Sequence, residues 1–258
     1  MGRQFLIVTA NDNETTALLE DHEFFPHESG VRSELPDDVL FYNKGRFGEQ
    51  EVVHFQLPDQ GSVRADSSLP SVLAAIEAWK PHAVILLGVA FGKDNEEKGE
   101  PRQHIGDVLI STRIADYESG RLQGGALQSD GSQPDSGRHL KHIFQTYAKT
   151  WHHEISGRKA ESRFGLILSG DKVVDDAAFK MELFKQYPRA IGGEMEGRGA
   201  YAACRWKRID EWILVKGICD WGESKQTPTK EHDQLTAARA AVSLLKHVFS
   251  EGNAFDKL

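Results

Sequence analysis

Two glutamates flank a methionine where a glycine-rich turn leads into a small-residue segment. The stretch IGGEMEGRGAYAAC, residues 191–204, places Glu194 and Glu196 around Met195. Residues i and i+2 of an extended segment point to the same side, so both carboxylates could reach one ligand. A helix usually starts with a capping residue and then apolar periodicity, and this segment departs from that pattern. The alternative is that the acids only interact favourably with the dipole of the following helix.

Acidic residues also follow other apolar runs of the chain. Glu14 comes shortly after FLIVTA, Asp171 after GLILSG, and Asp220 after WILVKGIC. In open α/β sheets ligands bind at the carboxyl ends of the strands, so these side chains are expected near one another. Almost no cysteine, histidine or serine stands among them. The set therefore favours acid–base chemistry on a polyol, and no G-x-S-x-G, P-loop or G-x-G-x-x-G motif suggests otherwise.

Strands and helices are expected to alternate along the chain. The expected strands, several of them continuous apolar runs typical of strands buried on both faces, are 5–10, 49–57, 82–92, 106–114, 163–170, 189–196 and 211–220. The expected helices begin near residue 14 and cover 68–79, 137–151, 175–187, 197–206 and 231–250. The polar, glycine-rich stretch 124–137 is predicted to be a loop. The alternation predicts an α/β fold with a mostly parallel sheet covered by helices on both faces.

Composition excludes several classes of protein. The chain has 258 residues, 39% of them hydrophobic, and no linker divides it, so residues 1–258 are predicted to form a single domain. A net charge of −8 argues against a nucleic-acid surface. Cys204 and Cys219 stand in apolar contexts, as buried thiols do, and no metal-ligand spacing occurs. Without a signal peptide or a membrane-spanning run, we expect a soluble, cytoplasmic protein with no metal or cofactor.

Several motifs together resemble one family. GGEMEGRGAYAAC and WILVKGICDWGES, with Asp220 twenty-four positions after Glu196, resemble the nucleoside phosphorylase and nucleosidase superfamily, in particular its 5′-methylthioadenosine/S-adenosylhomocysteine nucleosidases. VILLGVAFG, IGDVLIS and LILSGD are similar to further segments of that family. The resemblance spans most of the chain and implies a three-layer α-β-α sandwich with a central mixed, mostly parallel, twisted sheet. GVAFGKD and VKGICDWGES also resemble nucleosidase-like domains attached to immune-type regulatory proteins.

The resemblance implies a role for each acidic residue. Glu196 would accept hydrogen bonds from the ribose 2′ and 3′ hydroxyls, each worth about 1.5–3 kcal/mol for a charged acceptor. Met195 would pack on the sugar, and Glu194 would support the site from the neighbouring position. Asp220 would be the general acid that protonates the leaving purine. Glu14 would activate water, unless it is only a first-turn helix glutamate.

The resemblance also implies where the base and the 5′ group bind. The backbone around Val173 and Val174 would contact the base, although the family often has a phenylalanine there. Ala90, Phe91 and Gly92, in the glycine turn, would complete this pocket. Four charged loop side chains would hold a 5′ phosphate chain if they face the site and are otherwise solvated charges: Lys93, Arg102, His104 and Lys225.

The expected function is hydrolysis of the N-glycosidic bond of a purine nucleoside or nucleotide, with adenine as the expected base. TANDNETTALLE contains no arginine, and Asp12 and Glu14 would repel phosphate. The alternatives are a phosphate-dependent purine nucleoside phosphorylase, an ATP- or AMP-degrading effector of an antiviral defence system, and a non-catalytic nucleoside-binding module.

The resemblance further implies a homo-oligomer, either a dimer or a trimer or hexamer, with a nucleoside or nucleotide as the other partner and no nucleic acid or membrane. The segment 32–48 is a candidate contact surface, because it carries four apolar or aromatic residues in a polar context: Leu40, Phe41, Tyr42 and Phe47. A local edge hairpin is the alternative reading of this segment.

Overall fold

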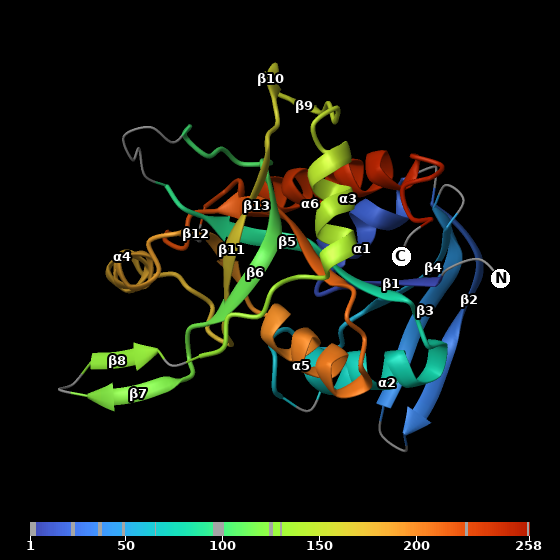
Figure 1. The fold of residues 1–258 in the computed structure, drawn as a ribbon. Coiled ribbons are helices and arrows are strands. Elements are labelled where there is room, and N and C mark those ends of the chain that lie inside the picture. Colours follow the sequence, from blue (N-terminus) through green and yellow to red (C-terminus); the bar gives the residue numbers. More distant parts are fainter. Residues whose placement is uncertain are drawn as a thin grey trace.

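Strands and helices alternate along the chain in the computed structural model (Figure 1), which describes residues 4–21, 24–35, 38–47, 50–64, 66–94, 101–123, 126–129, 131–224, 227–256 and 258. The helices are α1 (Asp12–Leu19), α2 (Ser68–Trp79), α3 (Arg138–Tyr147), α4 (Ala177–Gln186), α5 (Gly197–Lys207) and α6 (Lys230–Phe249). The strands are β1 (Gln4–Thr9), β2 (Phe24–Leu35), β3 (Asp38–Phe47), β4 (Gln50–Gln56), β5 (Ala83–Gly92), β6 (Val108–Asp116), β7 (Gly120–Gln123), β8 (Ala126–Ser129), β9 (Glu154–Ile155), β10 (Arg158–Lys159), β11 (Ser162–Ser169), β12 (Ala190–Glu194) and β13 (Trp212–Asp220).

The main sheet is mixed. Its order within the described ranges is β12-β11-β6-β13-β5-β1-β4-β3-β2. Strands β1, β4, β5 and β13 run parallel to one another, whereas β6, β11 and β12 run the other way. β12 also pairs with β5, so that β12, β11, β6, β13 and β5 close into a ring. Gly192 and Gly193 permit this pairing, because a Cβ at either position would overlap Phe91.

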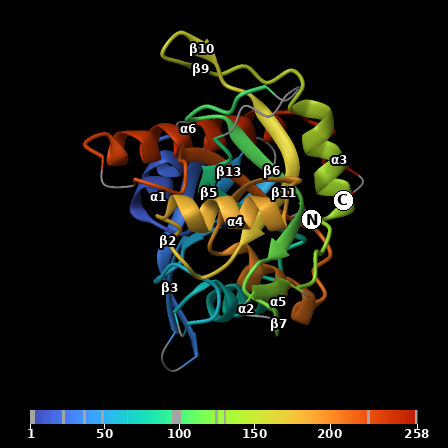
Figure 2. The same ribbon diagram turned by 90° about the vertical axis from the view of Figure 1, so that its left-hand side faces the viewer.

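Helices cover both faces of the sheet (Figure 1). Helices α1, α3 and α6 pack on one face and α2 and α5 on the other. Successive residues of a strand alternate between the two cores: Phe5 and Ile7 of β1 join the first, while Leu6 and Val8 join the second. This double burial explains why the strands read as continuous apolar runs. Figure 2 shows α4, which lies beside the β11–β12 end of the sheet. The predicted α/β sandwich is confirmed.

Some boundaries differ from the predictions. Residues 126–129 of the predicted loop form β8, which pairs with β7 in a separate ribbon. α3 ends at Tyr147 rather than near 151, because the chain turns there and buries Trp151 against α6. β2 and β3 form an antiparallel hairpin at the sheet edge. Phe47 is fully buried and Tyr42 packs on Trp79 at a ring distance of 5.3 Å, so neither is free to form the predicted contact surface.

The side chains of Leu40 and Phe41, the other two residues of that predicted surface, lie outside the part of the chain whose side chains the structure describes. None of the helices in the described ranges combines the length and the apolar character that a bilayer crossing requires.

Candidate active site

The carboxyl ends of four strands, β1, β5, β12 and β13, meet around a cavity of about 210 Å³. Both polar and apolar residues line the cavity, a combination that can bind and orient a small molecule. The cavity brings together nine of the residues singled out from the sequence: Glu14, Ala90, Phe91, Val173, Val174, Glu194, Met195, Glu196 and Asp220. Residues more than 200 positions apart therefore face one space.

Two of the other predicted residues lie in or next to β5 but do not line this cavity. Gly92 pairs with Gly192 of β12 in the ring of strands. Lys93 is buried, and its Nζ donates to the carbonyl oxygen of Pro188 at 3.1 Å and lies 5.7 Å from the centre of the Phe184 ring. The Lys93 ammonium therefore points toward α4, away from the expected 5′ group.

The remaining predicted 5′ contacts lie on the loop between β5 and β6 or outside the described residues. Arg102 is exposed and lies 3.7 Å from Asp94, and His104 lies 3.9 Å from Asp107. Neither side chain lines the cavity. Lys225 is outside the described residues. The positions of Arg102 and His104 give no support to the predicted contact with a 5′ phosphate.

Glu14 is held rigidly at the start of α1. The side chain of Asn11 caps the helix by accepting the backbone N–H of Glu14 at 3.0 Å. The Glu14 carboxylate is 2% exposed, and its two oxygens accept the backbone N–H groups of Ala10 at 2.5 Å and Val89 at 2.8 Å. Gly88 leaves room for it, because a Cβ there would overlap the carboxylate. Both oxygens of the Glu14 carboxylate are therefore held in place by the backbone.

A lysine is buried among the carboxylates of the site. Lys216, in the middle of β13, is 1% exposed, and its Nζ lies 3.2 Å from Oε2 of Glu196 and 3.8 Å from Oε2 of Glu194. Burial alone would lower the pKa of Lys216, but the charges of Glu196, Glu14 and Glu194 raise it. Lys216 therefore stays protonated. Lys216 was not among the residues predicted from the sequence, although a lysine inside a strand buried on both faces signals a buried anion.

Burial also sets the protonation of the carboxylates. It raises the pKa of Glu14, and the nearby charge of Glu196 adds to this effect, while Lys216 opposes it. Burial likewise raises the pKa of Glu194 to about 7, again against the effect of Lys216. A buried carboxylate whose pKa is raised toward neutrality is a better proton acceptor than an exposed one. Glu14 is therefore a candidate for a general base.

Glu194 faces the start of α5. Its carboxylate accepts the backbone N–H of Glu196 at 3.0 Å and that of Gly197 at 2.9 Å. The acid thereby satisfies N–H groups that have no partner inside the helix. The hydroxyls of Ser62 and Ser68 donate to the carbonyl oxygens of Met195 and Glu196, at 2.6 and 2.7 Å. The Met195–Glu196 backbone is therefore fixed from both sides.

Asp220 stands at the last position of β13. The backbone N–H of Gly222 donates to Oδ1 at 2.7 Å, and the thiol of Cys219 donates to Oδ2 at 3.2 Å. Phe91 and Val174 line the cavity beside it and pack in one apolar cluster. The carboxyl group is thus oriented against an apolar wall that could accept a flat ring.

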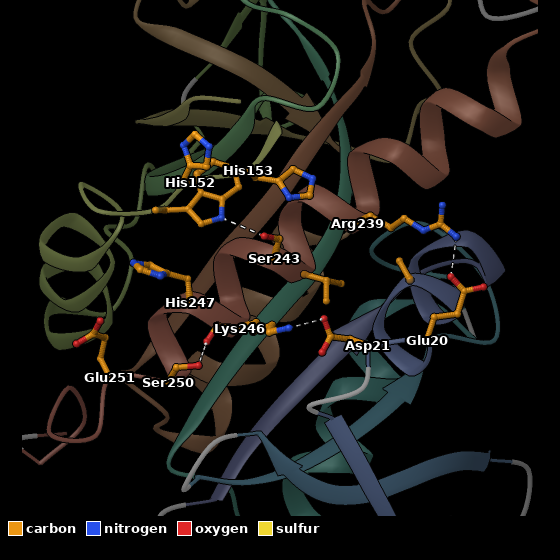
Figure 3. A pocket seen from close by; sticks show the side chains of 13 residues that line it. Glu20, Asp21, His152, His153, Arg239, Ser243, Lys246, His247, Ser250 and Glu251 are labelled. Atoms are coloured by element: carbon orange, nitrogen blue, oxygen red, sulfur yellow. Dashed lines mark hydrogen bonds and ion pairs between the residues drawn. The ribbon is translucent and has the colours of Figure 1, made fainter. Parts of the chain in front are cut away.

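A larger hollow of about 550 Å³ lies elsewhere, between α1, α6 and the segment after α3 (Figure 3). None of the residues singled out from the sequence lines it. Two of its basic residues are already paired, Arg239 with Glu20 at 2.7 Å and Lys246 with Asp21 at 3.6 Å. Size alone therefore does not identify the site, and the convergence of buried, charged groups favours the smaller cavity.

Curated relatives of the chain are nucleosidases. A Death domain-containing ATP nucleosidase of Amphimedon queenslandica is 28% identical over 268 residues, which cover 96% of this chain and 48% of the relative. ATP nucleosidase Cap17 of Escherichia coli is 25% identical over 72% of this chain and 38% of its own length. A 5′-methylthioadenosine/S-adenosylhomocysteine nucleosidase of Staphylococcus haemolyticus is 23% identical over 90% of this chain and 93% of the relative. The chain spans half or less of the two ATP nucleosidases.

Solved structures share the fold. The 5′-methylthioadenosine/S-adenosylhomocysteine nucleosidase of Neisseria meningitidis, in complex with methylthio-immucillin-A, superposes with a TM-score of 0.75 at 20% identity, covering 96% of this chain and 99% of that one. Futalosine hydrolase of Helicobacter pylori gives a TM-score of 0.75 at 20% identity, covering 96% and 98%. A sequence model of the phosphorylase superfamily matches residues 4–250. The resemblance seen in the motifs is thus confirmed: the chain belongs to the phosphorylase superfamily.

Proposed function

We propose that the chain hydrolyses the N-glycosidic bond of an adenine nucleoside or nucleotide. One observation carries this proposal: Glu14, Glu196 and Asp220 line the same cavity, and Glu14 is buried with a raised pKa. Cleavage of the bond builds positive charge on the sugar and negative charge on the base. Carboxylates on one side and a proton donor on the other match that separation of charge.

Glu14 acts as the base that removes a proton from the attacking water. Its carboxylate is fixed by the amides of Ala10 and Val89, so water would meet it in one orientation. The charge of Lys216 keeps the pKa of Glu14 lower than burial alone would set it. This effect favours the ionised form of Glu14, the form that can accept a proton from water.

Glu196 binds the ribose diol, because its two carboxylate oxygens can accept from both hydroxyls. Lys216 donates to Oε2 of Glu196 at 3.2 Å, and this charge-assisted hydrogen bond holds the carboxylate in place. Met195 packs its thioether on the sugar. The charge of Glu196 then also favours the cationic sugar of the transition state.

Asp220 donates a proton to the leaving purine, and the apolar residues beside it contact the ring. Val173, Val174 and Phe91 line the cavity with it. Val173 is also 61% exposed, so it lies at the mouth. The thiol of Cys219 and the amide of Gly222 orient the Asp220 carboxyl so that one oxygen can face the base.

Water rather than phosphate is the proposed nucleophile. Three buried carboxylates surround the place where the nucleophile would stand, with Lys216 as the only buried cation among the described side chains next to them. A phosphate dianion would be repelled there. Hydrolysis therefore fits the charge of the site better than phosphorolysis.

Two lysines at the cavity bear on the 5′ substituent. Lys172 is already paired with Glu118, whereas Lys230, the exposed first residue of α6, has no ion pair with the described residues. A second hollow of about 280 Å³ adjoins the cavity at Lys230 and gives room for a 5′ chain. The ATP nucleosidases among the relatives lend weight to a nucleotide. We therefore propose that the 5′ group carries phosphate and that Lys230 contacts it.

Product analysis tests the proposal. The protein is incubated with adenosine, methylthioadenosine, adenosylhomocysteine, AMP or ATP, with and without phosphate, and the products are separated by chromatography. We expect free adenine and a free ribose moiety at a rate independent of phosphate. Glu14→Gln and Asp220→Asn should each lower the rate by about 10²–10⁴-fold, the usual contribution of acid–base catalysis. Formation of ribose 1-phosphate would refute hydrolysis.

Lys230→Met tests the 5′ group separately. Loss of one charged hydrogen bond of about 1.5–3 kcal/mol should raise KM for the nucleotide by about 10–150-fold and leave KM for adenosine unchanged. Lys185→Met, which removes a lysine that is 78% exposed on α4, is the matched control. Equal effects on adenosine and on the nucleotides would exclude Lys230 as a phosphate ligand.

A further inference from the structure

One arginine joins three carboxylates beside the cavity. Arg198 is the second residue of α5, and its side chain is 19% exposed. Its Nη2 donates to Asp171 at 2.8 Å, and its Nη1 lies 3.2 Å from Asp116 and 3.4 Å from Glu118. Asp116 ends β6, Glu118 lies in the turn after it, and Asp171 lies in the segment after β11. One guanidinium thus holds three separate segments of the chain.

The segment after β11 forms part of the cavity wall. Residues 172–174 line the cavity and directly follow Asp171. Asp171 is anchored twice more: its Oδ1 accepts the backbone N–H of Ser62 at 2.5 Å, and its own backbone N–H donates to Glu118 at 2.9 Å. The position of the 172–174 wall therefore depends on where the Asp171 carboxylate is held.

The backbone of Arg198 belongs to a second part of the cavity wall, because it follows Met195 and Glu196 in the chain. Its N–H donates to the hydroxyl of Ser169, the last residue of β11, at 2.8 Å. The side chain of Arg198 holds the wall that would contact the base, while its backbone belongs to the helix start that would contact the sugar. A displacement of the guanidinium would change the distance between these two walls.

The energetics of the network argue for positioning rather than stability. Burial disfavours the ionised form of Asp116, but hydrogen bonds from Ser119 and Glu118 and the charge of Arg198 hold its pKa below the usual value. The Nε of Arg198 is buried without a hydrogen-bond partner among the described residues, which opposes folding. Buried ion pairs often add little net stability, because desolvation offsets their attraction. Their fixed geometry is the property that a binding site can use.

We propose that Arg198 is a positioning residue that sets the separation between the 172–174 wall and the Met195–Glu196 backbone. The inference rests on the proposed function, because it assigns the two walls to base and sugar. Lysine cannot replace arginine here, since a single ammonium lacks the planar fork that reaches several carboxylates at once. Substrate binding should therefore be more sensitive to this residue than the chemical step is.

The test compares Arg198→Lys and Arg198→Met with Arg205→Met, which removes an exposed arginine from the same helix. Kinetics are measured with the best nucleotide substrate, and amide hydrogen exchange is measured on the substrate-free proteins. Both Arg198 variants should raise KM about tenfold and change kcat less than about threefold, because Glu14 and Asp220 are not moved. Exchange should accelerate at residues 170–175 and stay unchanged in β13. Arg205→Met should behave as wild type.

A double variant separates positioning from simple destabilisation. If Arg198 acts through Asp171, adding Asp171→Asn to Arg198→Met should give a KM close to that of Arg198→Met alone, not about a hundredfold rise. Multiplicative effects, a loss in kcat at unchanged KM, or unchanged exchange at residues 170–175 would each overturn the inference. If wild type releases no base from any substrate, the proposed function fails, and the exchange measurement still decides whether Arg198 holds the 172–174 wall.

Discussion

The charge of Lys216 sets the pH at which the site works, and Lys216→Met removes that charge while nearly preserving length and volume. In wild type the lysine lowers the pKa values of Glu14 and Glu194 against the effect of burial. Without it, each carboxylate becomes harder to ionise. If Glu14 must be ionised to accept a proton from water, the variant should require a higher pH for activity.

The size of the effect follows from the distances. The Nζ of Lys216 lies 3.8 Å from Oε2 of Glu194. At an effective dielectric constant of about 20, Coulomb's law gives an attraction of about 4 kcal/mol at this separation. This attraction is with Glu194. Lys216 is also the largest charge that acts on Glu14, where it lowers the pKa. One pKa unit corresponds to about 1.36 kcal/mol. Because relaxation and the remaining charges offset much of the lost attraction, we expect the acidic limb to move by about one unit or more.

The assay is the pH dependence of kcat/KM for base release, because it reports the ionisation of the free enzyme. The acidic limb of the Lys216→Met profile should lie at higher pH than that of wild type, with activity partly recovered in alkaline buffer. Lys185→Met, an exposed substitution on α4, should leave the profile unchanged. If the acidic limb of the Lys216→Met profile lies within about 0.3 pH units of the wild-type limb, whatever the level of activity, the charge of Lys216 does not control the ionisation of Glu14 and the assignment is refuted.

Three further predictions concern neighbours of the same groups. Gly88→Ala should lower the rate of base release about 10²-fold and also lower the unfolding temperature, because the new Cβ would displace the buried Glu14 carboxylate from its two backbone donors. Because the pKa of Glu194 is raised from 4.5 to about 7 in the folded protein, wild type should lose stability as pH rises through this window. Glu194→Gln should show a smaller loss in thermal unfolding measured across the same range, while Glu14, whose pKa is also raised, still contributes to it. Cys219→Ala removes a weak hydrogen-bond donor to Asp220 and should lower kcat by about 2–10-fold. The kcat of the variant is compared with that of wild type at saturating substrate.

The regular elements could be predicted from local sequence because double burial leaves a local signature. Strands β5 and β13 read as continuous apolar runs, and both occur within a residue of the expected bounds. The short β7–β8 ribbon had no such signature, since each strand has only four residues and mixes polar with apolar ones. Its pairing depends on contacts across a turn, which composition does not encode.

The candidate site was predictable only in part. Strand-end acids such as Glu14 and Asp220 could be found from their places directly after apolar runs, because the topology brings the strand ends together. Lys216 was missed because its partners Glu194 and Glu196 become neighbours only when β12 and β13 both lie beside β5. Lys93 and Arg102 were both predicted to contact the 5′ group. In the structure Lys93 contacts Pro188 instead, and Arg102 lies beside Asp94. Which way a loop side chain points depends on long-range contacts that one sequence does not reveal.

The closed ring formed by β12, β11, β6, β13 and β5 limits how this chain can vary. In a closed ring the stagger between strands is fixed. A residue inserted into one strand would therefore change the register of the pairing around all five strands. A one-residue shift in β12 would turn its side chains to the opposite face and separate Glu194 from the strand that carries Asp220. The β2–β3 hairpin lies outside the ring at the sheet edge. Length changes should therefore accumulate in that hairpin, while the ring strands keep their lengths.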